Sequence, residues 1–220
     1  MARIAFARRL APAVSIAVML LACSDPQSDD FVWANGAGCQ AGSPALSLSA
    51  ARHDSLPAYP DSLPLSLDEV FYRAALHTPG GFAGAYLEPV NGRNTTVLMF
   101  VNLTNARAAL DSLTPYYPWS HASLAPDSVR FRKVRWDWVQ LYDWYRYLLI
   151  VAGVDGLSVT DIQEVNNRLE FGAATAEDRG RVLRRLSELG VPCWLAAVSV
   201  QGYAVLKDGH RPPTSGIVGP

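Results

Sequence analysis

The sequence predicts an α+β fold in which helices pack on an antiparallel-rich sheet and the chain forms two ββαβ-like halves. The stretch Gly84–Val101 is the first observation, because Asn91-Gly92 favours a two-residue hairpin turn and Thr96–Val101 is a continuous apolar run typical of a central strand. The second observation is an echo: EPVNGR at 88–93 resembles QEVNNR at 163–168. A helix and then a strand are expected after each copy.

Local signals in the first half place each element in turn. Ser66-Leu67-Asp68-Glu69 is a capping-box pattern that starts a helix, and Thr78-Pro79-Gly80-Gly81 stops it. Ala85–Leu87 is the first hairpin strand, and apolar residues at helical spacing predict a helix over Leu103–Leu113. A long proline-containing loop follows. Ser128–Trp136 is then expected to be a strand with a bulge near Arg132-Lys133.

The second half is predicted to begin with a helix over Asp137–Gly153. Trp138, Tyr142, Tyr145 and Leu149 fall on one side of this helix, and the three aromatic residues are expected under the sheet. Asp143 and Arg146 mark the wet side. A second hairpin covers 157–162 and 168–172, with Leu169 and Phe171 inward. Thr175 is an N-cap, and Gly190 with Pro192 ends the helix that it starts. Trp194–Val200 is the last strand.

The amino terminus carries a targeting signal. Three arginines precede the apolar run Leu10–Ala22, which is too short for the ~20 residues of a membrane-spanning helix. The run ends in Leu20-Leu21-Ala22-Cys23, which resembles the lipobox of bacterial lipoproteins. The resemblance implies that residues 1–22 are removed and that Cys23 is acylated. An ordinary secretory signal and an uncleaved anchor are the alternatives.

The lipoprotein resemblance implies an address in the bacterial cell envelope. The protein is then anchored to a membrane through the lipid on Cys23 and faces the periplasm. Ser24 is not the aspartate that retains lipoproteins in the inner membrane, so a Gram-negative host favours the outer membrane.

Composition divides the chain into five parts. Residues 1–22 are the expected signal peptide, and 23–30 form a polar, acidic tether. Residues 31–65 mix glycine, proline and serine with scattered apolar residues and are expected to be mostly irregular. The α+β domain is assigned to 66–206, and 207–220 form a tail rich in glycine and proline.

Cysteine usage also fits export. With Cys23 acylated, Cys39 and Cys193 remain, and an even pair in an oxidising compartment is a disulfide candidate. The alternative is two unpaired thiols. A bridge would fasten the irregular amino-terminal segment to the carboxyl-terminal part of the fold.

Three stretches carry a second resemblance. GFAGAYLEPVNGR at 81–93, VRFRKVRWDWVQLYDWYRYL at 129–148 and DIQEVNNRLEFGA at 161–173 resemble the propeptide domains of secreted bacterial serine proteases of the streptogrisin and alpha-lytic type. In that family the domain assists folding of the attached protease and can occupy its active site. No protease follows within these residues, and Glu88 stands where the family has aspartate. The resemblance therefore implies a small binding module and transfers no functional residue.

No standard catalytic, nucleotide or metal motif is present, so no cofactor and no metal are expected. The formal net charge of −1 argues against nucleic acid as a partner. A triad of Ser120, His121 and Asp127 is disfavoured, because neighbours in one loop seldom form a triad.

Aromatic residues are the better candidates for recognition, because they offer large contact area at low entropic cost. The expected contacts with a protein partner are Tyr116, Tyr117, Trp119, Trp144 and Tyr147. For Trp144 and Tyr147 the alternative is packing against the amino-terminal segment.

Three arginines, Arg130, Arg132 and Arg135, could form a basic strip, but they are expected to pair with carboxylates such as Glu164 or Glu170.

Three functional hypotheses follow. The first is a non-catalytic envelope lipoprotein that binds an unknown protein, with a propeptide-like chaperone or inhibitor role as a special case. The second is an envelope hydrolase whose site forms only in three dimensions. The third is a structural envelope component.

Overall fold

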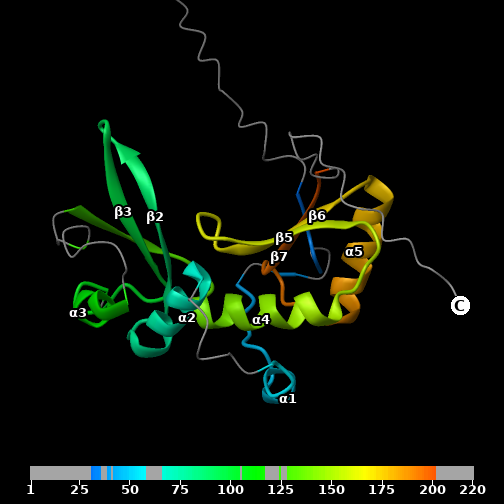
Figure 1. The fold of residues 1–220 in the computed structure, drawn as a ribbon, viewed down its shortest axis with the longest axis horizontal. Helices are drawn as coiled ribbons and strands as arrows, with labels where there is room; N and C mark the ends of the chain where they lie inside the picture. Colours follow the sequence, from blue (N-terminus) through cyan, green and yellow to red (C-terminus); the bar gives the residue numbers. More distant parts are fainter. Residues whose placement is uncertain are drawn as a thin grey trace, which may run out of the picture.

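The computed structural model describes residues 31–35, 39–40, 42–57, 66–104, 106–116, 124 and 128–201. The chain is α+β, as predicted, and it contains two ββαβ units that lie side by side along one helix (Figure 1). The first unit comprises β2 (Phe82–Val90), β3 (Arg93–Phe100), α3 (Leu110–Leu113) and β4 (Val129–Lys133). The second comprises β5 (Leu157–Gln163), β6 (Arg168–Ala173), α5 (Ala176–Glu188) and β7 (Ala196–Val200).

The two units form two sheets, whereas the sequence predicted one shared sheet. One sheet has the order β2-β3-β4, and the other β1-β7-β6-β5, where β1 is Val32–Trp33. In each unit the first two strands pair antiparallel, and the third returns through a crossover to pair parallel with the second. Each third strand therefore pairs with its own hairpin, and no strand of one unit pairs with a strand of the other among the described residues.

Predicted signals at the ends of elements are confirmed in both units. Helix α2 (Leu67–His77) begins with the Ser66 capping box, and the β2–β3 turn holds Asn91 and Gly92 at φ 50° and 74°. Thr175 caps α5 by accepting from the Asp178 N–H, and Gly190 follows the helix at φ 67°.

Two predictions in the first unit are wrong. Of the helix expected over 103–113 only α3 forms, and the short η2 (Thr114–Tyr116) follows it. The Asn102 side chain accepts from the Thr104 N–H, a local turn that competes with helix. The strand expected to reach Trp136 stops at Lys133 without a bulge, because Asn167 binds the backbone that follows.

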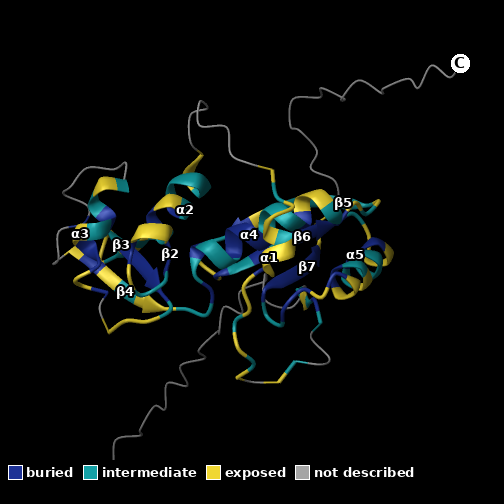
Figure 2. Ribbon diagram, turned by 90° about the horizontal axis from the view of Figure 1, so that it is seen from below, coloured by how far each residue is buried: buried dark blue, intermediate teal, exposed yellow. Residues whose placement is uncertain are grey.

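Helix α4 (Trp138–Val151) joins the two units and lies along both sheets (Figures 1 and 2). Its fully buried Trp138 meets Phe71 of α2 with ring centroids 4.9 Å apart, and further along the helix Leu148 is also fully buried. Gly84 of β2 makes this packing possible, since a Cβ there would lie 2.7 Å from the Trp138 ring. One continuous apolar core therefore runs through both units.

Two expectations for α4 are corrected. Leu149 is 53% exposed, whereas its neighbour Leu148 is fully buried, so the buried side of the last turn passes through Leu148 and not through Leu149. Asp143, expected in water, is buried at 7% exposure because the amino-terminal segment covers this side of α4.

That amino-terminal segment, expected to be mostly irregular, contributes β1 as the edge strand beside β7 and α1 (Ala50–His53) against α4. Cys39 and Cys193 lie at disulfide-bonding distance, with Cα atoms 5.5 Å apart, as expected for a bridge between the segment and the fold. Within the described residues, no helix combines the length and apolarity that crossing a membrane requires. Cys23, the expected signal peptide, the tether and the 207–220 tail lie outside those residues.

Candidate functional site

The structure removes Trp144 from the predicted partner contacts. Trp144 is only 3% exposed and donates its indole N–H to the Leu46 carbonyl at 3.0 Å. The Arg52 guanidinium lies over the rings of Trp144 and Tyr147, so both residues pack against the amino-terminal segment. This was the alternative for the pair. The sequence alone did not reveal that the amino-terminal segment covers the face of α4 that carries these two residues.

Tyr116 is half-buried and stacks on His77, with ring centroids 5.3 Å apart. Tyr117 and Trp119 lie outside the described residues, as does the disfavoured triad of Ser120, His121 and Asp127.

The three strip arginines do not use the carboxylates expected for them. Arg130 pairs with Glu88 at 3.4 Å, whereas Glu170 is held by Arg168 at 2.7 Å. Arg132 donates to the Tyr86 hydroxyl and to the Val165 carbonyl, and Arg135 donates to the Ser43 carbonyl.

These last two arginines line an open cavity of about 230 Å³ where the two units meet. We call it the junction pocket. Its lining combines three tryptophans with three cations, one valine and two asparagines. The tryptophans are Trp33, Trp136 and Trp194; the cations are Arg132, Lys133 and Arg135; the other lining residues are Val134, Asn166 and Asn167.

Asn167 builds the pocket by fastening one unit to the other. It sits in the β5–β6 turn at φ 51° and is buried, so its amide is held in place. Its side-chain oxygen accepts from the backbone N–H groups of Arg135 and Trp136 at 3.1 and 2.8 Å, and its nitrogen donates to the Trp136 carbonyl at 2.8 Å. These bonds satisfy the Asn167 side-chain amide together with two backbone N–H groups and one carbonyl of the segment before α4.

The tryptophans of the pocket are held by each other and by the backbone. Trp136 is fully buried and donates its indole N–H to the Trp194 carbonyl at 3.1 Å. Trp194 adopts φ 67°, a left-handed conformation that bulky residues rarely adopt and that is often found at functional sites. Its ring meets Trp33 of β1 edge-on, with centroids 5.6 Å apart. Cys193 precedes it, so the disulfide fixes the same stretch.

The cations of the junction pocket have no carboxylate partner among the described residues. Arg132 and Arg135 donate to neutral oxygens, and Lys133 is exposed without an ion-pair partner in the described part of the chain. The lining residues that the structure describes include no carboxylate, thiol, hydroxyl or imidazole. By contrast, Arg168 and Arg181, like Arg130, are paired with carboxylates. The pocket therefore suits an anionic group.

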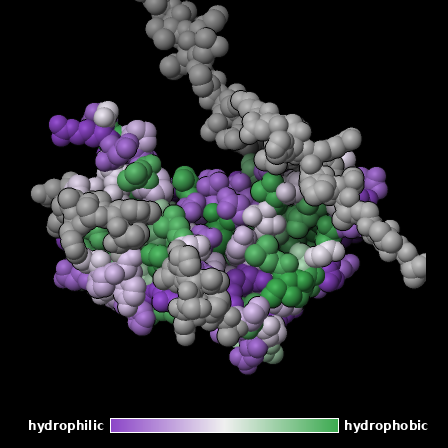
Figure 3. Space-filling view, in the orientation of Figure 1, coloured by the Kyte–Doolittle hydropathy of each residue, from purple (hydrophilic) through white to green (hydrophobic). Residues whose placement is uncertain are grey.

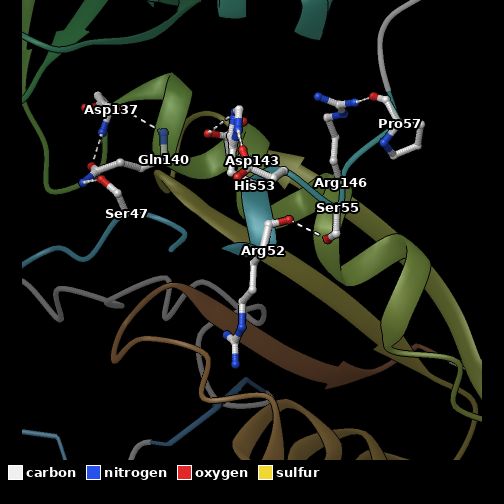
Figure 4. Close-up of polar contacts among 10 residues, drawn as sticks. Ser47, Arg52, His53, Ser55, Pro57, Asp137, Gln140, Asp143 and Arg146 are labelled. Atoms are coloured by element: carbon white, nitrogen blue, oxygen red, sulfur yellow. Dashed lines mark hydrogen bonds and ion pairs between the residues drawn. The ribbon is translucent and has the colours of Figure 1, made fainter. Parts of the chain in front are cut away.

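A second polar cluster lies between α1 and α4 (Figure 4). The His53 Nε2 is 3.8 Å from the Asp143 Oδ2, which is an ion-pair distance but longer than a hydrogen bond. Burial raises the pKa of Asp143, and His53 partly opposes this shift. The other carboxylate oxygen is buried and has no hydrogen-bond partner within the described residues. Arg146 of α4 also binds the amino-terminal segment, by donating to the Pro57 carbonyl after α1.

Carboxylates gather where α2 approaches β5. Burial raises the pKa of Asp68, Asp161 and Glu164. The charge of Asp161 raises the pKa of Asp68 and Glu164 further, whereas Glu170 is the neighbouring charge that raises the pKa of Asp161. Within the described part of the chain, no group of three or more histidine, cysteine or acidic residues could hold a metal ion.

No protein-family model and no curated protein matches this chain. The lipoprotein and propeptide resemblances therefore stay predictions, and function has to be argued from the sites themselves.

Sequence reasoning missed the junction pocket. Asn167 carried a signal, because the pair Asn166-Asn167 marks a tight turn. The left-handed Trp194 carried none, because aromatic residues have no preference for that conformation.

Proposed function

We propose that the protein is a non-catalytic, lipid-anchored module of the bacterial cell envelope that binds another protein through the junction pocket. The lipobox at Leu20–Cys23 supports the anchor and the address. The observation that carries the binding role is the pocket itself. Cations without an ion-pair partner among the described residues converge there with indole rings, from segments far apart in the sequence. Arginine and tryptophan are enriched where proteins recognise one another.

The pocket supports recognition better than catalysis. Acid–base and nucleophilic catalysis need a titratable or nucleophilic side chain beside the reacting atom, and the lining supplies arginine, lysine, indole and amide groups. These groups orient and hold a ligand. A propeptide-like role, as chaperone or inhibitor of a secreted protease, is one form of this function and rests on the resemblance of the hairpin and helix patterns.

The test is crosslinking and pull-down of the mature, lipid-bearing protein from its own membrane, comparing wild type with Lys133→Glu. The matched control is Arg93→Glu at the tip of the β2–β3 hairpin, an exposed and hydrophilic part of the surface (Figure 3). A defined protein should be captured by wild type and by the control, and lost with Lys133→Glu. Equal capture by all three would refute binding through the pocket. Mass spectrometry of the same material checks for a lipid on Cys23.

An envelope hydrolase is the second candidate, and the His53–Asp143 pair is the observation in its favour. A half-exposed imidazole beside a buried carboxylate resembles the base and orienting acid of a hydrolytic site. A panel of ester and peptide substrates tests this candidate. Turnover that disappears in His53→Ala would support it, and turnover equal in both proteins would count against it.

A further inference from the structure

The polar groups of the junction pocket fall into those that the fold uses and those that it leaves free. The Asn167 amide and the Trp136 indole N–H are fully engaged within the chain. The indole N–H groups of Trp33 and Trp194 have no acceptor within the described residues, and both side chains are partly exposed. Indole offers a donor and no acceptor. As far as the described residues go, these two groups are therefore open to water or to an acceptor from a ligand.

The cations of the pocket are also donors with capacity to spare. Arg132 uses one nitrogen, Nη1, for both of its hydrogen bonds, to Tyr86 and to Val165. The other N–H groups of its guanidinium have no acceptor within the described residues. Lys133 adds an ammonium group without a partner in the described part of the chain. Every free polar group named here is thus a donor, and the charge is positive, so the complementary ligand is an anion rich in acceptors.

Pre-organisation favours a planar anion held in one orientation. The Arg132 guanidinium is anchored from β2 and from the β5–β6 turn, so little side-chain freedom is lost on binding. Arginine matches the two oxygens of a carboxylate with parallel hydrogen bonds. The indole walls add apolar area beside the charge, which suits a carboxylate attached to an apolar body. A cavity of about 230 Å³ is too small for a large ligand, since such pockets usually span ~300–1,000 Å³.

We infer that the junction pocket binds a carboxylate presented by a protein ligand next to an apolar residue. The inference rests on the proposed binding function and names the chemistry of the partner's anchor. Two sources supply this group: the free carboxyl terminus of a chain, or an aspartate or glutamate side chain within it. Both present the same two oxygens to Arg132, Lys133 and the two free indoles.

The test is two-dimensional NMR of the full chain in detergent, which reports each indole N–H separately. The probes are acetyl-Leu-Leu-Leu with a free carboxyl terminus, acetyl-Leu-Glu-Leu-amide, acetyl-Leu-Gln-Leu-amide and inorganic phosphate. A carboxylate peptide should shift the Trp33 and Trp194 signals. The Trp138 and Trp144 signals, whose N–H groups donate to the Asp68 and Leu46 carbonyls, should stay in place.

The four probes separate the possible ligands. A response to the first peptide alone assigns the site to carboxyl termini, and a response to the second assigns it to acidic side chains. Lys133→Gln should lower the affinity for the peptide that responds by about tenfold, the usual effect of removing one charged hydrogen bond. Arg93→Gln, the control, should leave the affinity unchanged.

Three results would overturn the inference: equal response to the glutamine peptide, stronger response to phosphate, or no shift of the two free indole signals with any peptide. The pull-down keeps this failure apart from failure of the proposed function. Capture that depends on Lys133 without any peptide response means that the pocket binds a protein through another chemistry. If neither Lys133-dependent capture nor a peptide response is observed, the pocket is not a binding site.

Discussion

Replacing both Cys39 and Cys193 by serine should lower the free energy of unfolding by about 3–5 kcal/mol. The two cysteines are 154 residues apart in the chain, so a bridge restricts most of the unfolded fold. In the loop-entropy relation a loop of this length corresponds to about 5 kcal/mol at 25 °C. That value is an upper limit, because a compact unfolded state has less entropy to lose. Domains of this kind are stable by only ~5–15 kcal/mol, so the loss is a large share of the total.

Urea unfolding followed by tryptophan fluorescence measures the effect. The wild-type protein should lose a similar amount of stability in dithiothreitol, whereas the double serine variant should be insensitive to the reductant. The slope of the unfolding free energy against urea should also rise without the bridge, because the unfolded chain exposes more surface. A loss below about 1 kcal/mol, or equal sensitivity of both proteins to reductant, would show that the bridge does not restrict the unfolded chain as the loop-entropy relation requires.

Three further predictions use the same unfolding assay. Gly84→Ala should cost about 2–4 kcal/mol, because the new Cβ meets the α4 indole at a positive φ. Gly92→Ala, where space is open, should cost only about 1 kcal/mol, and equal costs would contradict the packing argument. Asn167→Ala should cost about 2–3 kcal/mol by leaving buried backbone N–H groups unpaired, against under ~0.5 kcal/mol for the exposed Asn166→Ala. Burial, and then the glutamate opposite, raises the pKa of Asp161, so the folded chain holds a proton that the unfolded chain releases. Stability relative to Asp161→Asn should therefore fall as pH rises from about 4 towards neutrality, and a rise would reverse the assigned sign.

Local signals in the sequence were sufficient for the elements that carry their own caps and turns. The Ser66 capping box, the Asn91-Gly92 turn and the Thr175 cap all depend on hydrogen bonds or backbone angles within a few residues. The repeat of the hairpin motif was also enough to predict two ββαβ units.

The remaining features depend on contacts between distant segments. Whether six strands share a sheet is decided by which edges meet, and strand patterns do not encode that choice. Asp143 lies beside His53 of α1, which docks on α4, and the junction pocket is lined where Asn167 reaches the chain before α4. The conformation of Trp194 is imposed by its neighbours against the preference of its side chain.

Strand β1 limits where a ligand of the pocket can be found. Trp33, one wall of the pocket, follows the proposed lipid attachment at Cys23 by ten residues. A chain of that length reaches at most about 35 Å when fully extended. On the proposed anchor, the pocket is confined to a layer this thick above the bilayer. Proteins embedded in that membrane, or adsorbed to it, would meet it at high local concentration, whereas proteins diffusing further away would be out of reach.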